Sequence, residues 1–132
     1  MKYFGGKFRS GREISDVIKK LTPNTYDIYL EPFCGALSII IHMTDTYECY
    51  ASDYHPDLIC MWKELQNDTF IPPADVSEDD YNKIKLYKSP NAIKGFVGFG
   101  CSFGGKFFSG YAQKYTNGIN ENYLKAATNS IH

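Results

Sequence analysis

Gly35 and Asp53 are the two residues of this chain whose types and spacing could do chemistry together. Residues 26–31 alternate as a strand does and lead into Gly35, after which an apolar helix is expected over about residues 36–43. In open α/β sheets, nucleotides bind where the carboxyl end of a strand turns into a helix. Asp53 follows the next expected strand, residues 47–52, and lies eighteen positions after Gly35, a spacing at which a carboxylate can accept both ribose hydroxyls. The pair predicts a nucleoside site, and a structural turn beside a helix-capping Asp is the alternative.

The composition of the turn narrows the class of ligand. It reads Glu31-Pro32-Phe33-Cys34-Gly35-Ala36-Leu37-Ser38 and holds one clear glycine, where dinucleotide-binding turns have three. Gly35 lets the chain turn tightly and lets a ligand approach the backbone, because glycine has no Cβ. The ligand need not carry a phosphate, and the turn therefore favours S-adenosylmethionine over a dinucleotide.

A second candidate segment lies at the start of the chain, where Tyr3-Phe4-Gly5-Gly6-Lys7 combines an aromatic face, two adjacent glycines and a cation. The glycines let the backbone lie flat against a neighbour, and Tyr3 could face a ring or a cation. A flexible terminus is the alternative reading of this segment.

The elements that must position these residues alternate along the first 67 residues as helix, strand, helix, strand, helix. Helices are expected over residues 10–20 with Ser10 as the cap, over 56–67, from Ser77 onward, from a Ser89-Pro90 cap to Gly100, and near 120–131. This alternation is typical of an α/β fold with a parallel, doubly wound sheet. Two strands give too little sheet to bury helices on both faces, so the sheet is expected to be incomplete within these residues.

Together these segments resemble the DNA adenine methyltransferases of the deoxyadenosine-methylase type, and in particular phage- and prophage-type members. Tyr3 to Lys7 match the N-terminal aromatic-x-Gly-Gly-Lys motif of that family, which contacts the cofactor. Glu31 to Ser38 match its Glu-Pro-Phe-x-Gly-x-Gly-Ser loop, and Asp53 matches its ribose-binding acid. The glycine- and aromatic-rich residues 98–108 look like the segment that such members carry before their catalytic half.

The resemblance implies a Rossmann-like methyltransferase fold with a mainly helical insertion. It divides the chain into a cofactor-binding α/β half, residues 1–67, and a mainly helical part with the Gly/aromatic loop, residues 68–132. The cofactor-binding residues that it implies are Tyr3, Lys7, Glu31, Phe33, Gly35 and Asp53. Lys106 in the loop is expected to approach the backbone of double-stranded DNA, and a loop simply packed by its phenylalanines is the alternative.

Two departures from the family pattern bear on activity. Leu37 stands where the family usually has a second glycine, and no Asp-Pro-Pro-Tyr occurs, since the only Pro-Pro pair, Pro72-Pro73, lies between Ile71 and Ala74. That motif accepts the protons of the adenine amine and stacks on the flipped base, so no catalytic residue is assigned. Three hypotheses stay open: a truncated methyltransferase, an inactive cofactor- or DNA-binding module derived from one, and half of an enzyme completed by a second chain.

Composition and charge exclude several other classes. No stretch approaches the length of a membrane span and no signal peptide begins the chain, which favours the cytoplasm. The four cysteines form no Cys-x-x-Cys pair, so neither a metal site nor a disulfide framework is expected. The net charge is −1, but residues 1–20 hold six basic and two acidic side chains, which could face phosphates or simply line a solvated helix.

Overall fold

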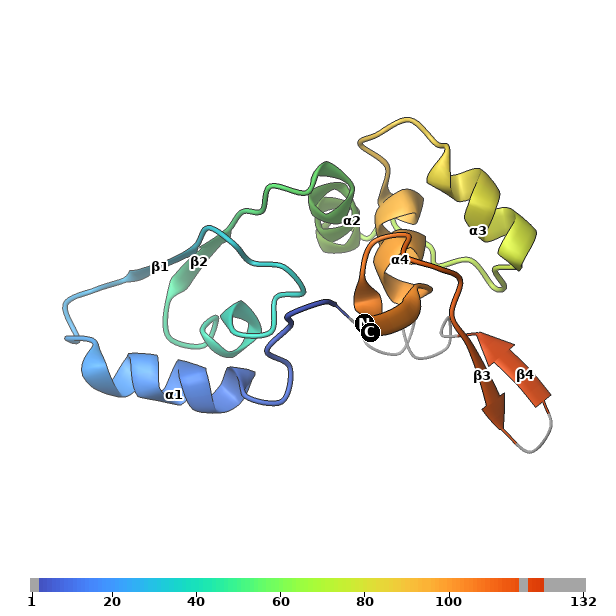
Figure 1. Cartoon of the computed structure of the whole chain (residues 1–132). Helices are drawn as coiled ribbons and strands as arrows, with labels where there is room; N and C mark the ends of the chain where they lie inside the picture. Colours follow the sequence, from blue (N-terminus) through green and yellow to red (C-terminus); the bar gives the residue numbers. More distant parts are fainter. Residues whose placement is uncertain (1–2, 117–118, 123–132) are drawn as a thin grey trace. The chain divides into compact units, whose positions relative to one another are not determined.

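The elements of the chain fall into two units in the computed structural model, which describes residues 3–116 and 119–122 (Figure 1). One unit spans Gly5–Tyr54, and the other joins Met1–Phe4 to His55–His132. The boundary expected after residue 67 separates a cofactor-binding part from a mainly helical part by function, and it stays a prediction. Packing divides the chain elsewhere, because the helix that begins at Pro56 groups with the residues that follow it.

The Gly5–Tyr54 unit holds helix α1 (Gly11–Leu21), strand β1 (Ile28–Glu31), the short 3-10 helix η1 (Ile40–His42) and strand β2 (Glu48–Ala51). The two strands pair in parallel, from Ile28 opposite Glu48 to Glu31 opposite Ala51. In Figure 1, α1 and η1 lie on one side of this pair. The small parallel sheet among helices agrees with the expected α/β class, and the complete Rossmann-like fold stays a prediction.

Helix α1 is attached to the rest of its unit by a close contact between its backbone and that of the loop before η1. Gly11 lies so near the loop before η1 that a Cβ there would sit 1.9 Å from the carbonyl oxygen of Ser38. The Lys19 ammonium, in the last turn, forms an ion pair at 2.8 Å with Asp45. Ser10 occupies the N-cap position as expected, but its side chain makes no capping hydrogen bond.

The larger unit is mainly helical, with α2 (Pro56–Gln66), α3 (Glu78–Lys85), α4 (Ala92–Gly100) and the 3-10 helix η2 (Phe103–Gly105). A hairpin of β3 (Gln113–Thr116) and β4 (Ile119–Asn122) follows. Helix α4 packs against both α2 and α3. The core is mainly apolar and buried, and it includes Leu58, Met61, Phe70, Val76, Tyr81, Ile84, Phe96, Val97 and Phe99.

A buried carboxylate ties the two central helices of this unit together. Asp57, in the first turn of α2, accepts hydrogen bonds from the Ser89 hydroxyl and the Asn91 backbone N–H, each at 2.8 Å. Gly95 of α4 lies against the same turn, since a Cβ at Gly95 would be 2.4 Å from the Asp57 carbonyl oxygen. Two charge-assisted hydrogen bonds satisfy this buried group and set the start of α4 beside α2.

Three expectations about secondary structure need correction. The helix over 36–43 shortens to η1, because Gly35 and Leu37 take left-handed backbone conformations that no α-helix can continue through. The cap of α4 is Asn91, whose side chain accepts from the Lys94 N–H at 3.0 Å, while the Ser89 hydroxyl is engaged by Asp57. Residues 120–122 of the segment expected to be helical near 120–131 belong to β4, and the rest of that segment lies outside the described residues.

The other expected helices are present at close to their predicted bounds. Ser77 caps α3 through a capping box with Asp80, which accounts for the helix start predicted there. The four cysteines are free. Within residues 3–116 and 119–122, no helix is long and apolar enough to cross a membrane, and no group of three His, Cys, Asp or Glu side chains could hold a metal ion.

Candidate functional site

The turn after β1 and the end of β2 are joined by the two residues that the spacing singled out. The Gly35 backbone N–H donates a hydrogen bond to Asp53 Oδ2 at 2.9 Å. Gly35 has a φ of 48°, in the left-handed region that glycine enters without strain. The structure therefore brings Gly35 and Asp53 together, eighteen residues apart, at the carboxyl end of the parallel strands.

Ser52 fixes the path of the turn. Its backbone N–H donates to the Glu31 carbonyl at 3.0 Å, and its own carbonyl accepts from the Cys34 N–H at 2.9 Å. Its hydroxyl donates to the Pro32 carbonyl at 3.1 Å. These bonds continue the strand pairing past its last residue, so the turn is held against the segment that carries Asp53. The sequence carried no signal for Ser52 beyond its place next to Asp53.

Glu31 ends β1 with its side chain half-buried. Its carboxylate accepts a hydrogen bond from the Tyr29 hydroxyl at 3.1 Å. Burial raises the pKa of Glu31 above its ordinary value and outweighs the hydrogen bonds from Tyr29 and the Ile40 backbone, which lower it. Burial and the neighbouring Glu31 raise the pKa of Tyr29 to about 12. Tyr29 was not predicted, although strand alternation places residues 29 and 31 on the same face.

Cys34 lies inside the turn and is not a nucleophile in this setting. Its side chain is buried, and burial together with Asp53 and Glu31 raises the pKa of the thiol to about 11. A thiol that stays protonated at neutral pH reacts slowly. Cys34 therefore serves packing under the turn.

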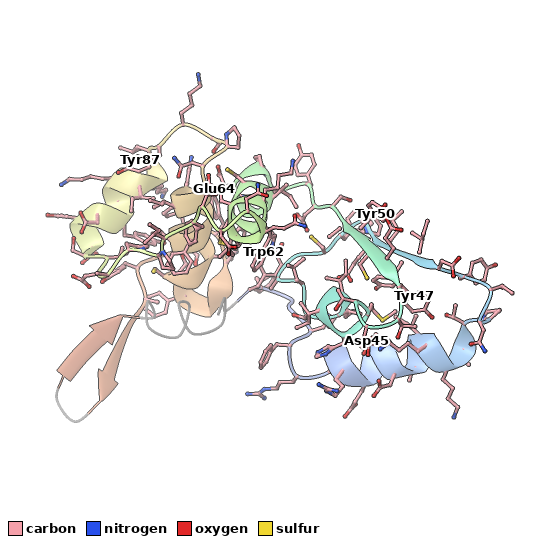
Figure 2. The ribbon with its side chains drawn as sticks, turned by 180° about the vertical axis from the view of Figure 1, so that it is seen from behind. Asp45, Tyr47, Tyr50, Trp62, Glu64 and Tyr87 are labelled. Atoms are coloured by element: carbon pink, nitrogen blue, oxygen red, sulfur yellow. The ribbon has the colours of Figure 1, made fainter. Side chains whose placement is uncertain are left out.

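Aromatic side chains stand exposed around the turn. Phe33 is 84% exposed, and Tyr54, directly after Asp53, is exposed as well. Tyr50 projects from β2 with half of its surface exposed, and Figure 2 shows it apart from Tyr47 and Asp45, which lie toward α1. Exposed rings can stack on a flat ligand such as an adenine.

Leu37 takes the conformation that a glycine would take. Its φ is 60°, and its N–H donates to the Cys34 carbonyl at 2.8 Å. A left-handed conformation costs a residue with a side chain about 1–2 kcal/mol. The backbone thus keeps a shape suited to the family's second glycine, while the side chain strains it.

The N-terminal motif is divided between the two units. Tyr3 belongs to the larger one, where its ring packs at 4.9 Å on Phe99. Lys7 belongs to the Gly5–Tyr54 unit, is exposed and donates from Nζ to the Gly5 carbonyl at 2.6 Å. Lys7, Glu31, Phe33, Gly35 and Asp53 therefore share one unit, and Tyr3 lies in the other.

Lys106 follows the η2 turn and is exposed. Its backbone N–H donates to the Phe103 carbonyl at 3.3 Å, and Phe103 is itself 55% exposed. Gly104 has a φ of 64° and open space where a Cβ would be. The turn thus presents a cation and an aromatic ring to solvent.

A family model described as D12 class N6 adenine-specific DNA methyltransferase matches residues 3–99 of the chain. The matched range includes all six residues expected to bind the cofactor and ends before Lys106. No curated protein and no solved structure matches the chain.

Proposed function

The chain belongs to the D12 class N6 adenine-specific DNA methyltransferase family, and we propose that it supplies the S-adenosylmethionine-binding part of such an enzyme. The observation that carries the proposal is the hydrogen bond at 2.9 Å between the Gly35 N–H and Asp53 Oδ2. It sets a carboxylate beside a glycine turn at the carboxyl end of a parallel sheet, where nucleosides bind.

The residues at the turn fit the nucleoside part of the cofactor. A carboxylate can accept several hydrogen bonds at once, and we assign the ribose hydroxyls to Asp53, which also accepts from the Gly35 N–H. Gly35 leaves room for close approach, and the exposed ring of Phe33 offers a face for the adenine. Tyr3, Lys7 and Glu31 enter the proposal through the family motifs that they match.

When bound, S-adenosylmethionine supplies an electrophilic methyl group for the exocyclic amine of adenine in DNA. The chain's own residues bind and orient, since transfer to a ring-delocalised amine is mainly a matter of position. The protons of that amine need an acceptor, which Asp-Pro-Pro-Tyr provides in the family and which this sequence does not contain. We therefore propose that the 132 residues alone do not methylate DNA.

A second candidate function is an inactive cofactor- or DNA-binding module derived from such an enzyme. The absence of Asp-Pro-Pro-Tyr from the sequence favours it. Both candidates share the cofactor turn and a double-stranded DNA partner in the cytoplasm. Incubating the chain with tritiated cofactor and unmethylated DNA tests activity: no methyladenine is expected, and turnover would mean that another residue receives the amine.

Calorimetric titration with S-adenosylmethionine tests the cofactor proposal. Weak binding is expected for the parent chain, and Asp53→Ala should lose two charge-assisted hydrogen bonds to the ribose, about 1.5–3 kcal/mol each. Asp53→Asn keeps an oxygen that can accept from the Gly35 N–H but removes the negative charge. It therefore shows whether affinity depends on the charge or on the hydrogen bond that holds the turn. Asp16→Ala, on the exposed side of α1, is the control. Equal affinity of Asp53→Ala and the parent would refute the assignment.

The DNA contact proposed for Lys106 is tested by salt dependence. One phosphate contact contributes about 1 to the slope of log K against log salt, so Lys106→Ala should reduce the slope by that amount. Lys85→Ala, an exposed lysine in the same unit, controls for general charge. A slope that Lys106→Ala leaves unchanged would count against the contact.

A further inference from the structure

The residues that follow α4 fold back onto it at a position that only glycine allows. The Phe108 N–H donates to the Gly98 carbonyl at 2.9 Å. A Cβ on Gly98 would lie 2.2 Å from Phe107 Cε2 and 2.7 Å from Phe108 Cε2. Both rings therefore rest directly on the backbone of α4.

From this position Phe107 enters a cluster of rings that ends at the N-terminal motif. The Phe107 ring lies 4.8 Å from Phe99 and 4.2 Å from His55. Phe99 in turn packs at 4.9 Å on Tyr3, the first residue of the motif. Aromatic pairs in such tilted and edge arrangements are worth about 0.5–1.5 kcal/mol each beyond the area they bury.

A backbone hydrogen bond joins the same two segments. The Phe4 N–H donates to the Gly105 carbonyl at 3.0 Å, and the Gly105 N–H donates to the Ser102 carbonyl at 3.1 Å. Residues 3 and 4 thus attach to the turn at 102–105, although Gly5 and the residues after it belong to the other unit.

The turn that receives Phe4 is itself held by a buried hydroxyl network. The Ser102 hydroxyl donates to the Gly98 carbonyl at 2.6 Å, which uses its one proton. The Tyr81 hydroxyl, 2.7 Å away, must therefore donate to Ser102 Oγ, and it accepts from the Gly110 N–H at 3.2 Å. Every polar atom of this network has a partner, so residues 98–110 offer a rigid support.

We propose that Phe107 is a positioning residue for the cofactor: packed on Gly98, it supports Phe99 and thereby holds Tyr3 and Phe4 in place. The segment after residue 99, which the family model does not match, would then serve the cofactor-binding motif as well as DNA. The inference rests on the proposed function for the role of Tyr3 toward the cofactor, and on contacts within one unit for the support.

Amide hydrogen exchange at Phe4, together with cofactor affinity, tests this. Phe107→Leu removes the ring, and exchange at the Phe4 amide should rise by about two- to tenfold, which corresponds to the loss of the Phe107–Phe99 pair. S-adenosylmethionine affinity should fall by a similar factor. Phe107→Tyr, which keeps the ring, should restore both. The matched control is Phe70→Leu, which removes a core ring that packs on Phe96 at 5.5 Å in the same unit.

The control separates positioning from general stability. A positioning role predicts that Phe107→Leu frees the Phe4 amide more than the amides of α2 and α4, whereas Phe70→Leu changes all of them together. If Phe4 exchange follows the global change equally in both variants, the inference is overturned. If the parent binds the cofactor and Phe107→Leu binds as well as the parent, the inference fails while the proposed function stands. If the parent binds no S-adenosylmethionine, the proposed function fails. The exchange rate of the Phe4 amide then decides by itself whether Phe107 supports the N-terminal motif.

Discussion

The two units of the chain keep their shape by different means. In the larger unit, apolar side chains such as Leu58, Met61 and Phe96 are completely buried in a core between helices. In the Gly5–Tyr54 unit, the apolar side chains of Ile28 and Leu30 are more than 60% exposed, and the turn is held by backbone and carboxylate hydrogen bonds.

The difference follows from how much surface each set of elements can cover. Helix α4 packs on both α2 and α3 and encloses a core with them, whereas the residues of the two parallel strands are all exposed or half-buried. The unit that carries the candidate cofactor turn is thus the one with less core of its own. Completion of its sheet by further sequence or a second chain stays a prediction.

The largest effect should come from the helical core. Phe96→Ala should lower the free energy of unfolding by about 3–5 kcal/mol, because it opens a cavity around a fully buried ring. Phe33→Ala, in the other unit, should change it by less than about 0.5 kcal/mol, because that ring is exposed. Urea unfolding is followed by the fluorescence of Trp62, the single tryptophan, for the larger unit and by far-ultraviolet circular dichroism for both units. Equal losses in the two variants would contradict the contrast between the units.

Gly11→Ala should act on the smaller unit alone. Its Cβ would lie 1.9 Å from the Ser38 carbonyl oxygen, so α1 must move. This movement should lower the free energy of unfolding of the smaller unit by about 1–3 kcal/mol. Far-ultraviolet circular dichroism should show early loss of helix, while the unfolding transition seen by Trp62 stays where it is. Ser10→Ala is the matched control, since that side chain makes no capping hydrogen bond. A shift of the Trp62 transition with Gly11→Ala would mean that the units unfold together.

Glu31 should make the smaller unit weaken as pH rises. Because burial raises its pKa above the ordinary 4.5, its contribution is fully present below that value and is lost as pH rises through the folded value. Glu31→Gln should remove this fall, measured as the free energy of unfolding between about pH 4 and 7. Glu13→Gln, at an exposed position of α1, should leave the slope as it is. If the parent and Glu31→Gln keep the same pH dependence, burial does not raise the pKa of Glu31 in the folded chain.

The smallest effect is expected at Leu37. Leu37→Gly relieves about 1–2 kcal/mol of left-handed strain but adds freedom to the unfolded chain, so the net gain should stay below about 1 kcal/mol. Cofactor affinity should rise, because a ligand can approach the glycine more closely. Asp68→Gly is the control in the larger unit, since Asp68 has a φ of 56° and aspartate tolerates that conformation better. A larger gain at Asp68 than at Leu37 would contradict strain as the cause.

Local patterns in the sequence predicted most of the elements and assigned Gly35 and Asp53 to one site, and the structure joins these two residues by a hydrogen bond. The strand patterns identified β1 and β2, and the Ser77 cap identified α3. Each of these signals lies within the element that it predicts or directly beside it. The end of the helical pattern at Leu37 could not be predicted, since only the folded turn shows its left-handed backbone. The cap of α4 depends on Asp57, more than thirty residues away, which no local pattern reports. The attachment of Phe4 to Gly105 spans nearly the whole chain and was equally out of reach.

The most direct measurement of the cofactor turn is the movement of backbone amide signals in isotope-labelled protein as S-adenosylhomocysteine, the demethylated product, is added. The Gly35 and Asp53 amides should shift in a saturable way, because the ribose hydroxyls would bind the same carboxylate that accepts the Gly35 N–H. The amides of the enclosed core around Phe96 should keep their positions, and Asp53→Asn should weaken the response. Saturable shifts elsewhere in the chain, with Gly35 and Asp53 unmoved, would contradict the site.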